Sequence, residues 1–164
     1  MKLAFRPLTG NDWISVAEIY RQGIETKNAT FETEIPAWEK WDSSHLSTCR
    51  IVATIEDSIV AWAALVLVSK RKVYSGVAEI SIYVSDNYKR QGIGTKLLKK
   101  LITESEKEGF WTLQAVIFPE NIVSLKIHQN LGFRKVGYRE KIGNVDCIWR
   151  DTILLERRST IVGK

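Results

Sequence analysis

The chain has 164 residues, of which 45% are hydrophobic and 26% are charged. This size and composition are typical of a globular protein with a single core, so residues 1–164 are expected to form one domain. No apolar stretch reaches the length of a membrane span, and the N-terminus lacks the apolar core of a signal peptide. We therefore predict a soluble, cytoplasmic protein with no membrane partner.

The net charge of +5 permits two kinds of partner, a nucleic acid or a cofactor that carries several phosphates. Like charges gather only in short clusters such as residues 70–72, so a nucleic-acid-binding module stays a minor alternative, which would bind in a salt-sensitive manner. The two cysteines, Cys49 and Cys147, have neither metal-ligand nor redox spacing. This predicts reduced thiols and no metal site.

The N-terminal part of the chain predicts one strand and two helices. Residues 3–8 have the composition of a short strand, and capping residues at 9–12 precede an apolar pattern at helical spacing that begins at Trp13. Pro36 suits the first turn of a second helix, because proline lacks the N–H that a first turn leaves unpaired anyway. The side chains that this second helix would bury are Trp38, Trp41 and Leu46.

A hairpin is expected next. Residues 50–56 and 59–69 are typical of two strands, with a tight turn at Asp57-Ser58 between them. The second of these strands is apolar through most of its length, which predicts a central place in the sheet. Residues 70–76 then form a basic loop.

Residues 77–109 combine a strand, a glycine turn and a helix. Residues 77–84 are rich in β-branched and aromatic side chains, and apolar positions recur at helical spacing from Ile93 until Gly109, which suits a left-handed helix end. The first amides of such a helix have no intrahelical partner, the helix dipole favours negative charge there, and glycine lets a phosphate approach the backbone. We therefore predict that this turn holds a pyrophosphate.

The C-terminal part predicts three more strands and one helix. A strand at 111–118 is followed by a helix at about 122–131, for which Gly132 is the stop signal. Residues 133–140 and 145–157 are typical of two strands with Gly143-Asn144 between them. The whole order is β-α-α-β-β-β-α-β-α-β-β. It predicts an α/β fold with one mixed, partly antiparallel sheet that is flanked by helices and has a β-α-β unit at its centre.

The glycine turn at residues 89–94 fits neither of two common phosphate-binding fingerprints. The pattern G-x-G-x-x-G needs a third glycine, and the P-loop pattern is absent. The turn resembles Q/R-x-x-G-x-G/A after a strand, the signature of the GNAT superfamily of acetyl-CoA-dependent N-acetyltransferases. One departure is Lys89, which stands where the family usually has Gln or Arg. This departure matters little if main-chain amides hold the cofactor.

Four further features make the chain similar to the phosphinothricin and methionine sulfoximine/sulfone acetyltransferase branch of that superfamily. They are the loop 29–33, the strand 78–84 before the turn, the pattern N-x-x-S-x-x-x-H-x-x-L-G-F at 121–133, and Trp149-Arg150-Asp151. The element order is also that of the GNAT fold, so the resemblance covers nearly the whole chain. It implies acetyl-CoA as co-substrate, a small-molecule amine as acceptor, and a homodimer.

Glu79 is the first candidate for the chemistry. Strand alternation places it on one face with Ser81 and Tyr83. A carboxylate in the middle of a strand that looks buried is costly unless it is paired or used. The resemblance implies that Glu79 is the general base that takes the amine proton through water, and the alternative is a structural carboxylate paired with Arg50 or Lys72.

His128 is the second candidate. It lies on the same helical face as Asn121, with Ser124 close to that line. The resemblance implies that His128 is the general acid to the thiolate of coenzyme A, or a partner in a proton relay. The alternative is a histidine on a helix face with a satisfied hydrogen bond.

The resemblance also implies binding roles for other residues. The main chain of Ile82, Tyr83 and Val84 would pair with pantetheine, and Asn121 would bond pantetheine as well as cap its helix. The remaining cofactor-binding candidates are Lys89, Arg90, Gln91, Gly92, Ile93, Gly94, Thr95 and Ser124. The acceptor-pocket candidates are Phe31, Thr33, Glu34, Lys72, Val73 and Tyr74, with ordinary packing as the alternative for Phe31 and Tyr74.

Taken with the resemblance, the sequence predicts an N-acetyltransferase that moves an acetyl group to the α-amine of a small amino-acid analogue. Direct transfer in a ternary complex is expected, because neither cysteine has a context that suggests a covalent intermediate. Two alternatives stay open. One is another amine, such as a polyamine, an aminoglycoside or a peptide N-terminus, and the other is a coenzyme A-binding regulator without turnover.

Overall fold

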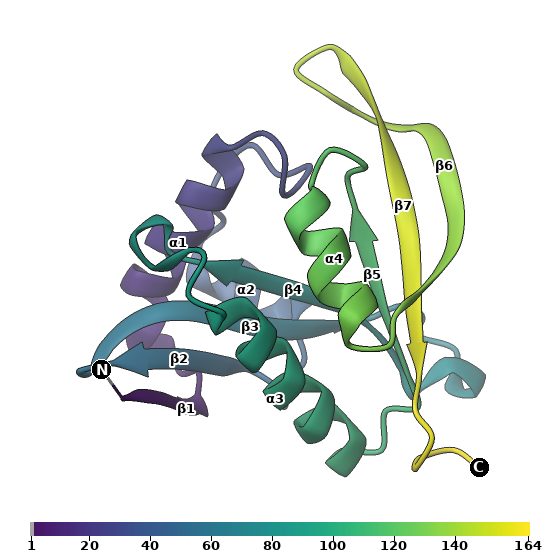
Figure 1. Ribbon diagram of the computed structural model, residues 1–164, viewed down its shortest axis with the longest axis horizontal. Coiled ribbons are helices and arrows are strands. Elements are labelled where there is room, and N and C mark those ends of the chain that lie inside the picture. The colour runs from purple at the N-terminus through teal and green to yellow at the C-terminus, as the bar shows by residue number, and fades with distance from the viewer. Residues whose placement is uncertain (1) are drawn as a thin grey trace.

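A seven-stranded sheet organises the computed structural model, which describes residues 2–164 (Figure 1). Its strand order is β1-β2-β3-β4-β5-β7-β6, and β4 and β5 are the parallel neighbours. The strands are β1 (Leu3–Pro7), β2 (Ile51–Ile55), β3 (Ser58–Leu67), β4 (Val77–Val84), β5 (Thr112–Ile117), β6 (Arg134–Val145) and β7 (Ile148–Arg158). The helices are α1 (Trp13–Glu25), α2 (Trp38–Ser44), α3 (Ile93–Lys107) and α4 (Ile122–Asn130), with short 3₁₀ turns η1 (Gly10–Asp12), η2 (Lys72–Tyr74) and η3 (Asp86–Tyr88). This order and the mixed sheet confirm the predicted fold class.

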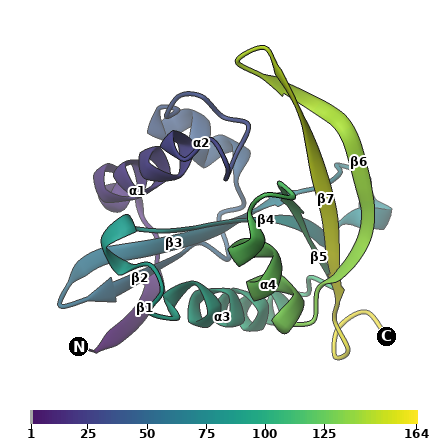
Figure 2. The same cartoon turned by 45° about the horizontal axis from the view of Figure 1, so that its top comes forward.

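Helices cover both faces of the sheet, with α1 and α2 over one face and α3 and α4 over the other (Figure 2). Strand β3 shows how the sequence arranges this, because its successive side chains point to opposite faces. Trp62 packs in a cluster with Val16 of α1, whereas Leu65 packs in a second cluster with Leu97 of α3. Both faces of β3 are therefore buried, which confirms its predicted central place.

Both hairpin turns lie elsewhere than the sequence predicted. The β2–β3 turn is made by Glu56-Asp57, with φ of 49° and 65°, and not by Asp57-Ser58. The β6–β7 turn is made by Asp146-Cys147, with φ of 51° and 63°, and not by Gly143-Asn144. Two-residue turns of type I′ need left-handed residues at both central positions, and residues other than glycine supply them here.

The second helix is shorter than predicted. It begins at Trp38 and ends at Ser44, so Pro36 lies before its first turn and Leu46 lies beyond its end. Trp41 is the buried residue of this helix, with Leu46 half-buried against the cluster that contains Leu97.

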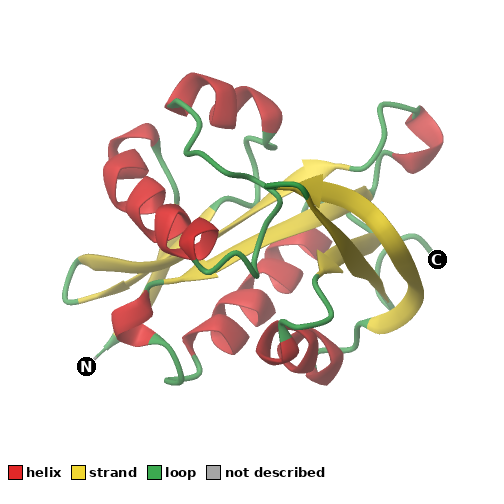
Figure 3. Cartoon of the chain, turned by 90° about the horizontal axis from the view of Figure 1, so that it is seen from above, coloured by secondary structure: helices red, strands yellow, loops and turns green. Residues whose placement is uncertain are grey.

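The β6–β7 hairpin extends beyond the rest of the sheet and leans toward the α1–α2 connection (Figures 1 and 3). Two contacts join these distant segments. Lys27 and Asp146 form an ion pair at 3.4 Å, and the Arg150 guanidinium donates to the Lys27 carbonyl at 2.7 Å. The hairpin and the connection are thus in direct contact, although they lie far apart along the chain.

None of the helices within residues 2–164 is both long and apolar enough to cross a bilayer.

Candidate active site

The parallel strands β4 and β5 separate soon after they begin to pair. Their register runs from Val77 opposite Thr112 to Glu79 opposite Gln114, although β4 continues to Val84 and β5 to Ile117. The other edge of β4 pairs with β3 along its length. Beyond Glu79, the edge of β4 that faces β5 therefore has main-chain groups free to bond a ligand.

The glycine turn lies where β4 leads into α3. Gly92 has φ of 74° and is the N-cap of α3, whose first intrahelical bond runs from the Lys96 amide to the Gly92 carbonyl at 3.2 Å. The amides of Ile93, Gly94 and Thr95 precede that bond and have no intrahelical partner. A Cβ at Gly92 would meet nothing within 4 Å. The main chain here is consequently open to an anion, with the positive end of the helix dipole behind it.

The polar side chains of this turn lie at the surface. Lys89 forms an ion pair with Asp86, and the Gln91 amide donates to the Asn87 carbonyl at 3.4 Å. Arg90 is exposed and has φ of 62°. A Cβ at Gly92 would meet neither Lys89 nor Arg90 within 4 Å.

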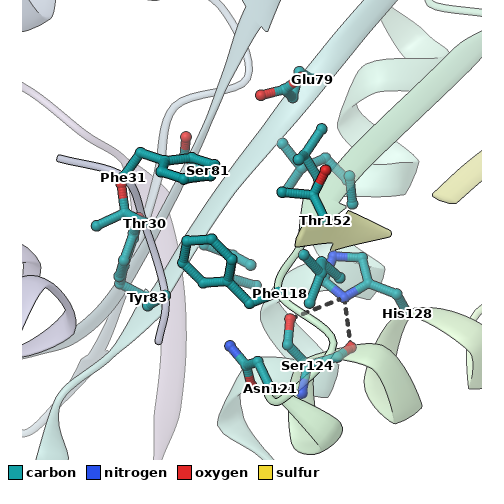
Figure 4. A pocket seen from close by; sticks show the side chains of 16 residues that line it. Thr30, Phe31, Glu79, Ser81, Tyr83, Phe118, Asn121, Ser124, His128 and Thr152 are labelled. Carbon is teal, nitrogen blue, oxygen red and sulfur yellow. Dashed lines mark hydrogen bonds between the residues drawn. The ribbon is translucent and has the colours of Figure 1, made fainter. Parts of the chain in front are cut away.

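A cavity of about 220 Å³ lies where the strands separate (Figure 4). The α1–α2 connection, β4, β5, α4 and β7 all contribute to it. Its lining residues are Ala29, Thr30, Phe31, Glu79, Ile80, Ser81, Ile82, Tyr83, Ala115, Val116, Ile117, Phe118, Asn121, Ser124, His128 and Thr152. The cavity thus brings together both predicted catalytic residues and several predicted binding residues from separate elements.

The other predicted acceptor-pocket residues lie outside this lining. They are Thr33 and Glu34, which are exposed in the α1–α2 connection, and Lys72, Val73 and Tyr74, which form the exposed turn η2 between β3 and β4.

Glu79 shares its face of β4 with Tyr83, as strand alternation predicted. Tyr83 packs against the cluster under α1, whereas Ile80 and Ile82 pack against the cluster under α3. The carboxylate accepts a hydrogen bond from Gln114 Nε2 to Oε2 at 2.8 Å. Arg50, one predicted alternative partner, pairs instead with Asp42, and the ion pairs among residues 2–164 do not include Glu79 with Lys72.

Gln114 is a site residue that the sequence did not reveal. Its position opposite Glu79 depends on the register of two strands that are far apart along the chain. No local pattern encodes that register, so no signal in the sequence could have identified Gln114.

His128 is buried, with 2% of its surface exposed, and its ring is held by one turn of α4. Its Nδ1 lies 2.8 Å from the Ser124 carbonyl oxygen, which can only accept a hydrogen bond, so Nδ1 carries the proton. Burial lowers the pKa of His128, which favours the neutral ring at neutral pH. Nε2 is then an acceptor, and no group among residues 2–164 bonds to it.

Asn121 has a structural role, as predicted. Its Oδ1 accepts from the Ser124 amide at 3.2 Å and caps α4. Its Nδ2 donates to the Asn28 carbonyl at 3.2 Å, which ties α4 to the α1–α2 connection. One N–H of this amide group is left for a ligand.

Aromatic rings close the end of the cavity near the hairpin. The rings of Phe31 and Phe118 meet edge to face at 4.8 Å, and the Arg150 guanidinium lies over Phe118 at 4.0 Å. Gly143 lies against Phe31 so closely that a Cβ there would be 2.5 Å from the ring. Glu79 is the acidic side chain among the lining residues, and Arg150 lies just behind the lining.

Comparisons with known proteins relate the chain to acetyltransferases. A sequence profile described as the Acetyltransferase (GNAT) family matches residues 13–133. The chain is 30% identical over 156 residues to phosphinothricin N-acetyltransferase of Streptomyces viridochromogenes, which covers 93% of this chain and 85% of that protein. It is 30% identical over 83 residues, 51% of this chain and 48% of that protein, to L-methionine sulfoximine/L-methionine sulfone acetyltransferase of Pseudomonas aeruginosa. The crystal structure of a GNAT superfamily phosphinothricin acetyltransferase from Sinorhizobium meliloti in complex with AcCoA superposes with a TM-score of 0.86 at 28% identity, covering 96% of this chain and 89% of that chain.

Proposed function

Because this chain belongs to the GNAT acetyltransferase family, we propose that it is an N-acetyltransferase that uses acetyl-CoA as its acetyl donor. The observation that carries the proposal is the separation of β4 and β5 together with the unpaired amides at the start of α3. This arrangement offers main-chain groups to a long polar ligand and free amides to its phosphates. Both lie next to a cavity that holds Glu79 and His128.

The residues present fit acetyl-CoA. The unpaired edge of β4 at Ile82, Tyr83 and Val84 would bond the pantetheine amides, and the amides of residues 92–95 would hold the pyrophosphate. Lys89 and Arg90 add positive charge beside that turn. When bound, acetyl-CoA supplies an acetyl group on a thioester, which an amine can attack.

Two side chains of the cavity would handle protons. Glu79 Oε1 has no protein donor among residues 2–164, so it is free to accept the proton of the amine, directly or across a water molecule. His128 is neutral with Nε2 as acceptor, so it must gain a proton before it can act as a general acid. A proton relay is therefore the role that we propose for His128, with proton uptake and release at Nε2.

We propose as acceptor the α-amine of a small amino-acid analogue of the phosphinothricin or methionine sulfoximine type. The support is that the relatives reported above carry those substrates in their names. The cavity volume of about 220 Å³ suits a small molecule. Arg150, whose guanidinium lies over the Phe118 ring, is a cation next to the lining that could attract a carboxylate.

A second candidate acceptor is an amine that carries no anionic group, such as a polyamine. The observation that favours it is the charge of the cavity lining. Of the described residues, those that line the cavity include the acidic Glu79 but no lysine or arginine. A carboxylate inside such a lining would lack a direct counter-ion.

We further propose a homodimer in the cytoplasm, where free thiols such as Cys49 and Cys147 persist. The β6–β7 hairpin supports self-association, because Tyr138, Ile148 and Trp149 are 51%, 60% and 60% exposed. Light scattering after size-exclusion chromatography measures the mass in solution, and a monomer at micromolar concentration would contradict the dimer.

The experiment that tests the function is release of free thiol from acetyl-CoA in the presence of one amine at a time. The amines are phosphinothricin, methionine sulfoximine, methionine sulfone, spermidine, an aminoglycoside and a short peptide. Turnover confined to the first three supports the amino-acid analogue, and turnover with spermidine supports the second candidate. Absence of turnover with every amine, while acetyl-CoA still raises the melting temperature, would favour a coenzyme A-binding regulator over an enzyme.

A further inference from the structure

Glu79 and Gln114 lie where β4 and β5 part. They form the last rung of the parallel ladder, and side chains at directly opposite positions point to the same face of a sheet. The next residues of both strands line the cavity instead of pairing with each other. The Glu79 carboxylate is therefore held at the point where β4 and β5 stop pairing, with the cavity beyond it.

The hydrogen bond between these two residues has a fixed direction. An ionised carboxylate only accepts, so the Gln114 amide must present Nε2, which lies 2.8 Å from Glu79 Oε2. Gln114 is half-buried, which limits the competition of water for this bond. Oε2 is occupied, and Oε1 is the carboxylate oxygen without a protein donor among residues 2–164.

Few other charges act on this carboxylate. The residue opposite Glu79 on β3 is Val66. The residue opposite Gln114 on β7 is Glu156, whose carboxylate forms an ion pair with the Arg134 guanidinium at 2.8 Å. The other titratable groups that line the cavity are Tyr83 on β4 and His128 on α4. No lysine or arginine of residues 2–164 forms an ion pair with Glu79, so the Gln114 amide is its direct polar partner.

We propose that Gln114 is a positioning residue for proton transfer: it holds Glu79 by Oε2 and leaves Oε1 as the atom that receives the amine proton. In that step the N–H bond breaks, its electron pair stays on nitrogen, and an O–H bond forms at Oε1. The donated hydrogen bond also fixes the orientation of the carboxylate, so Oε1 keeps facing the cavity. This inference rests on the proposed function of the site.

The kinetic test compares kcat, and KM for the amine, in three proteins. Gln114→Leu removes the donor at similar size, so kcat should fall by about tenfold while KM for the amine changes by less than about twofold. Gln114→Lys keeps a donor on a side chain long enough to reach Oε2, so it should recover part of the lost kcat. Loss of packing alone would not be reversed by a donor of a different shape. The matched control is Gln129→Leu, which makes the same change at an exposed position of α4.

A second readout needs no turnover. The side-chain carboxyl carbons of glutamate are labelled with ¹³C, and the Glu79 signal is identified by its loss in Glu79→Gln. At constant pH this signal should broaden in Gln114→Leu, because the carboxylate is no longer held in one orientation, and should stay sharp in Gln114→Lys. Acetyl-CoA affinity, measured by calorimetry, should stay within about twofold in both variants, because Gln114 does not line the cavity.

The outcomes separate this inference from the proposed function. If the unmodified protein acetylates none of the amines, the proposed function fails, and the carboxyl signal still measures what Gln114 does to Glu79. If the enzyme is active but Gln114→Leu leaves kcat and the carboxyl signal unchanged, Gln114 has no positioning role. Equal losses of kcat in Gln114→Leu and Gln114→Lys would also overturn the inference, because they would report general damage where β4 and β5 separate.

Discussion

The two sides of the cavity are encoded in different ways. The proposed cofactor side, residues 77–107, is a single run of strand, turn and helix, in which each element follows directly from the one before. The proposed acceptor side joins the α1–α2 connection to the β6–β7 hairpin through contacts such as Lys27–Asp146 and Arg150–Lys27, between residues 119 and 123 positions apart. Local geometry fixes the first side, and only the completed sheet fixes the second.

This difference predicts that the two sides respond separately to substitution. Changes in the glycine turn should alter cofactor affinity and leave the acceptor site intact. Changes where the hairpin meets the α1–α2 connection should alter acceptor affinity and leave cofactor binding intact. A substitution that affects both equally would show that the two sides behave as one unit.

The largest effect is expected from Gly92→Val, which should weaken acetyl-CoA binding by about 100-fold or more. Valine is strained at φ of 74° and its side chain would occupy the open space at the helix start, costing at least one charge-assisted hydrogen bond of about 1.5–3 kcal/mol with further loss from the displaced phosphate. Calorimetric titration with acetyl-CoA measures the loss. The control is Gly94→Ala, whose Cβ would lie at an ordinary 3.5 Å from Val84, so its affinity should change only slightly. Equal affinities in all three proteins would remove the turn from the cofactor site.

Glu79→Gln should lower kcat by roughly 100-fold or more, because the free Oε1 base is replaced by an amide that cannot accept the proton. The dissociation constant for acetyl-CoA should stay within about twofold of the unmodified value, since the main chain of β4 is unchanged. Glu39→Gln, at an exposed position of α2, is the matched control. Unchanged turnover in Glu79→Gln would exclude Glu79 as the base.

A smaller effect is expected on the acceptor side from Gly143→Ala. The added Cβ would lie 2.5 Å from the Phe31 ring, so the ring must move, and we expect KM for the amine to rise about tenfold with a stability loss of about 1–3 kcal/mol. Gly137→Ala on the same strand meets nothing within 4 Å and serves as the control. A large change in acetyl-CoA affinity in Gly143→Ala would contradict the separation of the two sides.

The smallest effect concerns pH and stability. Burial lowers the pKa of His128 in the folded protein, so below about pH 6.5 the unfolded chain binds more protons than the folded chain. Its contribution to stability is fully present above that pH and is lost as pH falls toward the folded pKa, by at most about 1.4 kcal/mol per pH unit. Urea unfolding at pH 7.5 and 5.5 should show this loss in the unmodified protein and a smaller loss in His128→Gln. Burial also lowers the pKa of His45, which is present in both proteins, so the difference between them reports His128. The same loss in both would show that His128 does not titrate differently in the folded state.

The secondary structure of the proposed cofactor side follows the local sequence pattern closely. Strand β4 covers Val77–Val84, α3 begins at Ile93, and Gly109 has a left-handed φ of 86°, all as the local pattern indicates. Alternation and helical spacing depend only on neighbouring residues, and glycine marks the positions where the backbone must be left-handed.

The hairpins show where local patterns fail. Glycine and asparagine at 143 and 144 are strong turn signals, yet β6 continues through them to Val145. Gly143 is needed instead for the close approach of Phe31, a contact across the tertiary structure. The left-handed turn falls on Asp146-Cys147, which no propensity for turns would have favoured over Gly143-Asn144.

The sequence by itself determined the fold class, the order of the elements and the residues of the glycine turn, because these follow from periodicities and backbone preferences within short segments. It also indicated Glu79, as a carboxylate within an apolar strand. Only the tertiary structure decided that Gln114 is the partner of Glu79, that the ring of His128 presents Nε2 as an acceptor, and that Lys72, Val73 and Tyr74 lie outside the cavity lining. Strand register and the packing of distant segments determine these contacts, and both depend on the whole sheet.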